Sequence, residues 1–159
     1  MTETTTYKYN SKRGLYLWLN SIGLTIAIMF IAYSTNNYHF FNSGLGEMMI
    51  WSSMILIIMI PFSVLFFNHL AFAKQVELAF HDKTFQYTNG QESCLIDLAD
   101  IKEVTEYAAS KMPYGFVIKW VIETDERNFT VSNLVIPHST IQYYFWNKMK
   151  YNFDFFPTV

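Results

Sequence analysis

The chain has 159 residues, enough for one ordinary domain or for a small domain joined to a membrane anchor. Hydrophobic residues make up 52% of it, and the formal net charge is −2. Residues 1–74 carry four basic and two acidic side chains, whereas residues 75–159 carry seven basic and eleven acidic ones. This acidic C-terminal half disfavours nucleic-acid binding, because phosphate backbones require clustered Lys and Arg. The single cysteine, Cys94, excludes an intrachain disulfide.

A basic N-terminal segment, residues 1–14, precedes a first apolar stretch over 15–33 that has no charged residue. A bilayer core about 30 Å thick needs about 20 helical residues, so this stretch predicts a transmembrane helix. Small and polar residues inside such a helix usually face another helix. We therefore expect a helix–helix contact at four positions: Asn20, Ser21, Gly23 and Thr25.

A second uncharged stretch begins at Met48, and its helix is predicted to continue to residue 73, with a kink at Pro61. A buried core helix and a cleaved signal peptide are the alternatives, and the length of both stretches favours two retained spans. Basic residues flank the spans, but the connecting loop, 34–47, has none. The positive-inside rule then predicts a bacterial inner-membrane protein with its N-terminus and C-terminal domain in the cytoplasm.

From residue 75 the hydrophobic period changes to two, which is typical of half-buried strands. Strands are predicted over 76–80, 85–87, 94–98, 102–109, 116–124 and 128–136, with a hairpin turn at Asn89-Gly90. A helix follows, because Ser139 and Gln142 fit a capping box and Ile141, Phe145 and Met149 recur at four-residue steps. This helix is predicted to end near residue 152, before an apolar tail over 153–159.

The predicted fold is therefore a membrane α-helical hairpin plus an α+β domain over 74–152. An antiparallel sheet or partly open barrel would be closed by one C-terminal helix. The hairpin-like runs Val76–Phe80 and Phe85–Tyr87, the strand Leu95–Ile101 and the helix from Ser139 together resemble bacterial pleckstrin-homology-like (PH-like) domains. The resemblance implies a PH-like fold behind two N-terminal transmembrane helices, and it says little about function.

No catalytic constellation is evident, so we expect neither an enzyme nor a bound cofactor or metal. His69 is the best histidine for a special role, although an ordinary interfacial residue is the simpler interpretation. The acidic residues Asp97, Asp100, Glu103 and Glu106 could suggest a divalent-ion site, but a solvated acidic face is favoured. Specific phosphoinositide binding is not expected, because the first hairpin offers only Lys83, next to an aspartate.

The leading functional hypothesis is a non-enzymatic inner-membrane protein that binds or scaffolds a protein partner. The alternatives are an immunity protein against a membrane-acting or secreted toxin, and a small accessory subunit of a transport or secretion complex. Membrane lipid and another protein subunit or a second copy are the expected partners. The candidate contact residues are Trp146, Lys148, Lys150, Phe153, Phe155 and Phe156.

Overall fold

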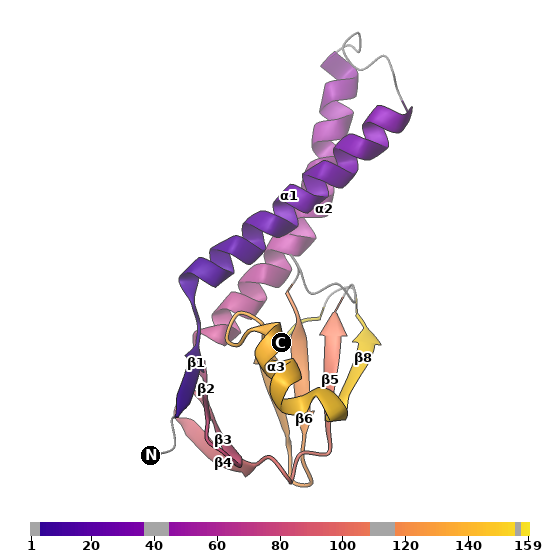
Figure 1. The fold of residues 1–159 in the computed structure, drawn as a ribbon. Coiled ribbons are helices and arrows are strands. Elements are labelled where there is room, and N and C mark those ends of the chain that lie inside the picture. The colour runs from indigo at the N-terminus through magenta and orange to yellow at the C-terminus, as the bar shows by residue number, and fades with distance from the viewer. Residues whose placement is uncertain (1–3, 37–44, 109–116, 155–156) are drawn as a thin grey trace.

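The computed structural model describes residues 4–36, 45–108, 117–154 and 157–159. Two long helices form a hairpin that leans away from a body of two sheets and one short helix (Figure 1). The helices are α1 (Ser11–Asn36), α2 (Leu45–Ala73) and α3 (His138–Phe145), which is followed by the 3-10 turn η2 (Trp146–Lys148). The strands are β1 (Thr5–Lys8), β2 (Val76–Phe80), β3 (Thr84–Asn89), β4 (Glu92–Asp97), β5 (Glu103–Ala108), β6 (Lys119–Glu123), β7 (Asn128–Ser132) and β8 (Met149–Phe153).

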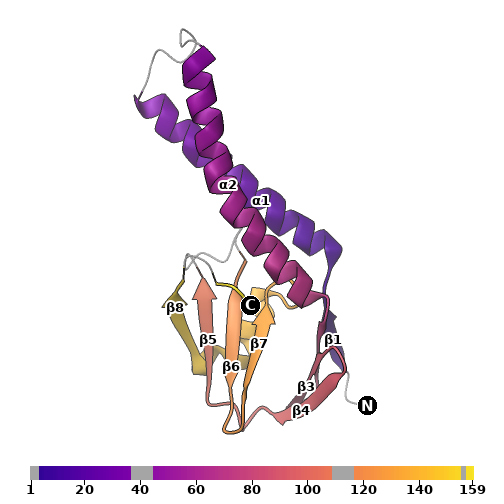
Figure 2. The same cartoon turned by 180° about the vertical axis from the view of Figure 1, so that it is seen from behind.

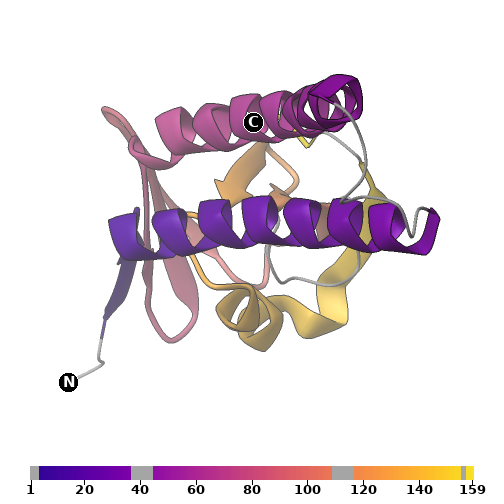
Figure 3. The same ribbon diagram turned by 90° about the horizontal axis from the view of Figure 1, so that it is seen from above.

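The helices α1 and α2 run side by side over the body (Figure 3). Their far ends extend beyond the sheets (Figure 1). The side chain of Asn10 caps α1 by accepting hydrogen bonds from the backbone N–H groups of Lys12 and Arg13, at 3.0 and 3.3 Å. In the described ranges, no helix is both long enough and apolar enough to cross a membrane. The transmembrane spans predicted over 15–33 and 48–73 therefore gain no support from the fold.

Two four-stranded sheets form the body, with the strand orders β1-β2-β3-β4 and β7-β6-β5-β8 (Figure 2). The six strands predicted from the period of two are all present: β2 has the predicted bounds, β3 and β4 are longer, and β5, β6 and β7 are shorter. The predicted turn between β3 and β4 is confirmed. The register of β3 and β4 leaves a two-residue loop, and Gly90 is its first residue. Gly90 has φ +62°, and no described non-glycine residue has a positive φ. A positive φ at the first loop position alone is typical of a type II′ turn.

Of the two predicted alternatives, the structure has the antiparallel sheet, as two separate four-stranded sheets that do not close into a barrel. Two expectations about this body are wrong. The last helix ends at Phe145 instead of near residue 152, and the chain continues as β8, which pairs in parallel with the free edge of β5. The expected capping box at Ser139 is also absent, since the helix begins one residue earlier, behind Pro137, with no side-chain cap.

The N-terminal segment supplies a strand that the sequence did not indicate. β1 pairs antiparallel with β2, although both long helices lie between them in the sequence. In this pairing Tyr7 lies opposite Leu78. The Tyr7 ring meets Phe80 edge-on, with the ring centroids 5.8 Å apart. The α+β body thus begins before the two helices, which form an insertion between its first two strands.

The hydrophobic core lies between the two sheets and under α3. Phe80 is central to it, with its ring stacked on Tyr144 at 4.2 Å and on Phe85 at 5.6 Å between centroids. Ile141 and Phe145 are the fully buried residues of α3, so the predicted four-residue spacing correctly identified the face that packs on the sheets. This packing fixes α3 next to β8, where the candidate site lies.

Candidate functional site

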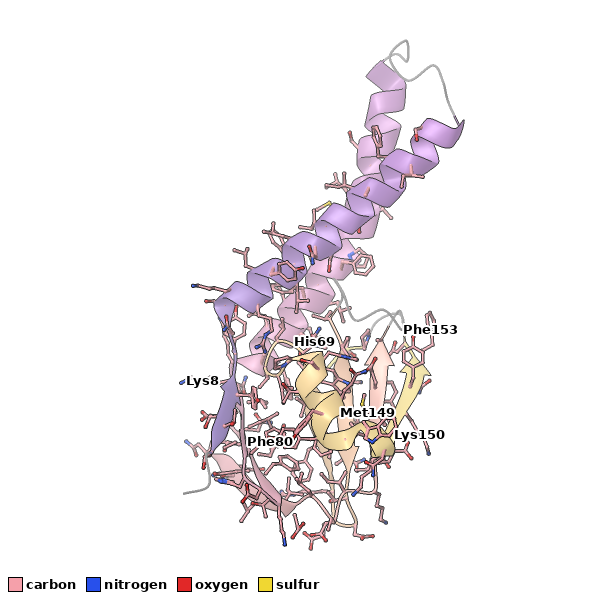
Figure 4. The ribbon with its side chains drawn as sticks, viewed as in Figure 1. Lys8, His69, Phe80, Met149, Lys150 and Phe153 are labelled. Carbon is pink, nitrogen blue, oxygen red and sulfur yellow. The ribbon has the colours of Figure 1, made fainter. Side chains whose placement is uncertain are left out.

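An open groove lies between α3 and β8 and is lined by both polar and aromatic residues. Its volume is about 550 Å³. It receives residues from β5, α3, η2 and β8, and Figure 4 labels two of them on β8, Met149 and Lys150. The lining residues are Glu106, His138, Gln142, Trp146, Met149, Lys150 and Tyr151. We call this surface the α3–β8 groove.

The carboxylate of Glu106 lies at the base of the α3–β8 groove and is almost wholly buried. Its Oε2 atom accepts one hydrogen bond from Nε1 of Trp120 at 3.0 Å and one from Nε2 of His138 at 2.9 Å. Burial raises the pKa of Glu106, but the hydrogen bonds from His138 and Trp120 outweigh it and hold the pKa below its usual value. The carboxylate is therefore ionised at neutral pH.

The second carboxylate oxygen of Glu106 differs from the first. No described residue donates a hydrogen bond to Oε1. Glu106 lines the groove, and Oε1 is therefore the carboxylate oxygen that could accept a hydrogen bond from a ligand there.

Two of the predicted contact residues, Trp146 and Lys150, line this groove. The side chain of Trp146 is 80% exposed at its edge. The ammonium of Lys150 forms an ion pair with Glu103, which raises the pKa of Lys150. Lys150 consequently brings little uncompensated positive charge to the groove.

The other predicted contact residues do not line it. Lys148 donates from Nζ to the carbonyl oxygens of Leu98 and Ile101, at 2.9 and 2.6 Å, and so holds the loop before β5. Phe153 points outward at the end of β8 and is exposed (Figure 4). Phe155 and Phe156 lie outside the described residues.

The four residues predicted to contact another helix have different surroundings. Ser21 and Thr25 line a small cavity between α1 and α2, opposite Met59 and Ser63. Asn20 is half-buried, and Gly23 is exposed. A Cβ atom added at Gly23 would meet nothing within 4 Å, so this glycine does not mediate a close approach between the helices.

His69 lies near the end of α2, where it meets the sheets (Figure 4), and is completely buried. Its Nε2–H donates to the carbonyl oxygen of Pro157, and its Nδ1 accepts from the hydroxyl of Ser132 at 2.8 Å. Burial is the main reason that the pKa of His69 falls to about 4. His69 is thus a structural link between α2, β7 and the C-terminal tail rather than an interfacial residue.

The acidic residues that could suggest a divalent-ion site do not converge on a common point. Asp97 accepts a hydrogen bond from the backbone of Ala99, while Glu103 pairs with Lys150. Within the described residues, no group of three or more His, Cys, Asp or Glu side chains could hold a metal ion.

Sequence reasoning missed the pairing of Glu106 with His138. One signal was available, because Glu106 occupies the same strand face as Val104 and Ala108, which are both buried. A carboxylate at such a position needs a partner, since an unpaired buried charge is strongly unfavourable. That the partner is a histidine from α3, 32 residues away, depends on the packing of α3.

Comparison with known proteins places most of the chain in one family. A family model described as "PH domain" matches residues 6–144. This range runs from β1 through the inserted helical hairpin into α3, and it ends before η2 and β8. No curated protein and no solved structure matches the chain. Since the model covers far more than half of the 159 residues, the chain belongs to the PH domain family.

Proposed function

We propose that this chain is a non-enzymatic binding protein of the bacterial inner membrane. The helical hairpin would be embedded in lipid, and the PH-like domain would bind a protein partner on the cytoplasmic side. One observation carries the proposal: the hairpin that emerges from the PH-like domain exposes large apolar side chains along both helices.

The exposed apolar residues of α2 support membrane embedding of the hairpin. Leu56, Ile57, Ile60, Val64 and Phe67 are between 57% and 68% exposed. α1 adds Leu15, Leu19, Ile26, Phe30 and Ile31, which are between 47% and 66% exposed. Water-soluble proteins rarely leave a continuous apolar patch of this kind uncovered. Lipid would cover the whole circumference of the hairpin, which a single protein partner would cover only in part.

The base of the hairpin differs from its far end. Leu65, His69 and Ala73 of α2 are buried against the sheets. The guanidinium of Arg13, at the start of α1, donates to the carbonyl oxygen of Val135 at 3.0 Å. His69 and the residues after it thus belong to the PH-like domain, and the proposed lipid-embedded part lies beyond them.

Basic residues lie near this base. Lys8, Lys12 and Lys74 are exposed there. Lysines beside a membrane segment favour the cytoplasmic leaflet, whose anionic lipids attract them. This supports an orientation with the PH-like domain in the cytoplasm.

The α3–β8 groove supports the binding role. β8 is an edge strand of its sheet, and no described strand pairs with its outer side. An edge strand next to a groove is the arrangement that recognises extended peptides by strand addition. We propose that the partner docks along β8 and into the groove.

Alkaline carbonate extraction tests the membrane part of this proposal on the full chain with a C-terminal tag. We expect the protein to stay in the membrane pellet. Ile57→Glu should shift part of it to the supernatant, because a charge in the hydrocarbon core is unfavourable by about 3 kcal/mol. Leu95→Glu is the matched control, since Leu95 is 65% exposed on β4, outside the hairpin. Release of the unaltered chain by carbonate would refute membrane embedding.

Purification in mild detergent, followed by mass spectrometry of co-eluting proteins, tests the binding part. We expect a partner in stoichiometric amount. Recovery of the chain alone from native membranes, at several detergent concentrations, would refute a stable complex with another protein.

A further inference from the structure

The α3–β8 groove combines an ionised carboxylate with exposed aromatic rings. We infer that it binds the cationic side chain of an Arg or Lys residue, carried by an extended segment of the partner. This inference rests on the proposed binding function and deepens it, because it specifies the chemistry that the groove recognises.

The charge of the groove is the first observation that supports this inference. Glu106 is held ionised by two hydrogen bonds, both to Oε2, which leaves Oε1 as a free acceptor. The other charged lining residue, Lys150, is already paired with Glu103. His138 binds the other oxygen of this carboxylate, so Oε1 is the oxygen left for a ligand. A carboxylate oxygen binds a guanidinium or ammonium group more strongly than a neutral donor.

The aromatic side chains of the groove are the second observation that supports this inference. Trp146 is 80% exposed at the edge of the groove, and Tyr151 lies beside Glu106 in the register of β5 and β8. The Tyr151 hydroxyl donates to the carbonyl oxygen of Ala108 at 3.1 Å, which fixes its ring in place. The faces of such rings attract cations. A cationic side chain that enters the groove would thus pass aromatic rings before it reaches the carboxylate.

The spacing between strands is the third observation that supports this inference. Neighbouring strands lie about 4.8 Å apart, so a segment added outside β8 would lie about 10 Å from β5. Arg and Lys have long side chains, which can extend across Tyr151 toward Glu106, whereas short side chains cannot. The acidic character of residues 75–159, with eleven acidic against seven basic residues, also favours approach of a basic segment.

Fluorescence anisotropy with labelled pentapeptides tests the inference, using the full chain in mild detergent. The probes are Val-Arg-Val-Arg-Val and its counterparts with Gln or Glu in place of Arg. We expect the Arg peptide to bind about tenfold more tightly than the Gln peptide, as a charge-assisted contact predicts. The Glu peptide should bind most weakly. Equal affinities for the three peptides would overturn the inference.

Three variants locate the effect. Glu106→Gln should remove the preference for Arg over Gln while leaving the affinity for the Gln peptide unchanged. Trp146→Ala should weaken the Arg peptide about threefold, because it removes one aromatic face. It should fold normally, since the side chain is exposed. Tyr143→Ala is the matched control, because Tyr143 is also 80% exposed on α3 but does not line the groove.

The same variants separate this inference from the proposed function. A co-purified partner that remains bound to both Glu106→Gln and Trp146→Ala would refute the groove as its site, while the binding function would stand. An Arg preference without any co-purified partner would support the chemistry of the groove and count against a stable partner complex. Loss of the partner from both groove variants, but not from Tyr143→Ala, would support the two proposals together.

Discussion

Replacing His69 with Gln tests how the base of the hairpin is joined to the PH-like domain. His69 connects α2 to β7 through Ser132 and to the tail through the carbonyl oxygen of Pro157. Two further contacts hold the same tail: Asn68 accepts from the backbone N–H of Val159, and Lys119 donates to the carbonyl oxygen of Thr158. The substitution removes the titratable ring and keeps an amide that can donate one hydrogen bond and accept another.

The expected effect on the pH dependence of stability follows from the pKa of His69. That pKa is about 4 in the folded protein, against the usual histidine pKa of 6.5 in the unfolded chain. A depressed folded pKa means that the unfolded chain binds the proton more readily, so stability is complete above pH 6.5 and falls as the pH drops toward 4. The full difference corresponds to about 3 kcal/mol, and about 2 kcal/mol of it is lost between pH 7 and pH 4.5.

Urea unfolding of the full chain in mild detergent, at several values between pH 7 and pH 4.5, measures this loss. The unaltered chain should lose about 2 kcal/mol more of its unfolding free energy over this interval than His69→Gln. At pH 7 the variant should itself be less stable by about 1–3 kcal/mol, because the amide fits the two buried partners less well than the ring. Parallel pH profiles for the two proteins would refute the buried, neutral state of His69.

Three further substitutions test other parts of the structure. Glu106→Gln should make stability less sensitive to acid below about pH 4.5, because the lowered pKa of this carboxylate gives stability that is lost as the pH falls through it; urea unfolding at pH 3.5 and pH 5 measures the difference. Tyr7→Ala should weaken the β1–β2 pairing by about 2 kcal/mol and speed amide hydrogen exchange in β2; unchanged exchange would contradict the role of β1. Phe80→Ala should lower the unfolding free energy by about 3–5 kcal/mol, whereas Leu95→Ala, at an exposed position, should change it by less than about 0.5 kcal/mol; similar losses for both would contradict the assignment of the core.

Much of the secondary structure could be predicted from the sequence, because it depends on local patterns. Alternating apolar residues indicated the six strands β2 to β7, and Asn89-Gly90 indicated the turn between β3 and β4. The long uncharged runs correctly indicated two long helices, although no helix within the described residues is long and apolar enough to cross a membrane. The resemblance to PH-like domains was noted on the order and local pattern of these elements, and the family match over residues 6–144 supports a PH-like domain.

The candidate site was predictable only in part. Trp146 and Lys150 were expected to contact a partner or lipid, and both line the α3–β8 groove. The pairing of Glu106 with His138 was not expected, because the two residues lie on different elements and no local pattern relates them. The structural roles of Lys148 and His69 also depend on carbonyl groups that are distant in the sequence.

The sequence by itself thus determined the two long helices, the six predicted strands and the turn between β3 and β4, since hydrophobic period and turn residues act over a few positions. The tertiary structure alone decided that β1 joins β2 across the inserted hairpin and that β8 joins β5 in parallel. Both pairings satisfy strand edges that would otherwise lack hydrogen-bond partners, and an edge can be recognised as free only when the whole sheet is assembled. The groove exists for the same reason, because the addition of β8 to β5 places its residues next to α3 and Glu106.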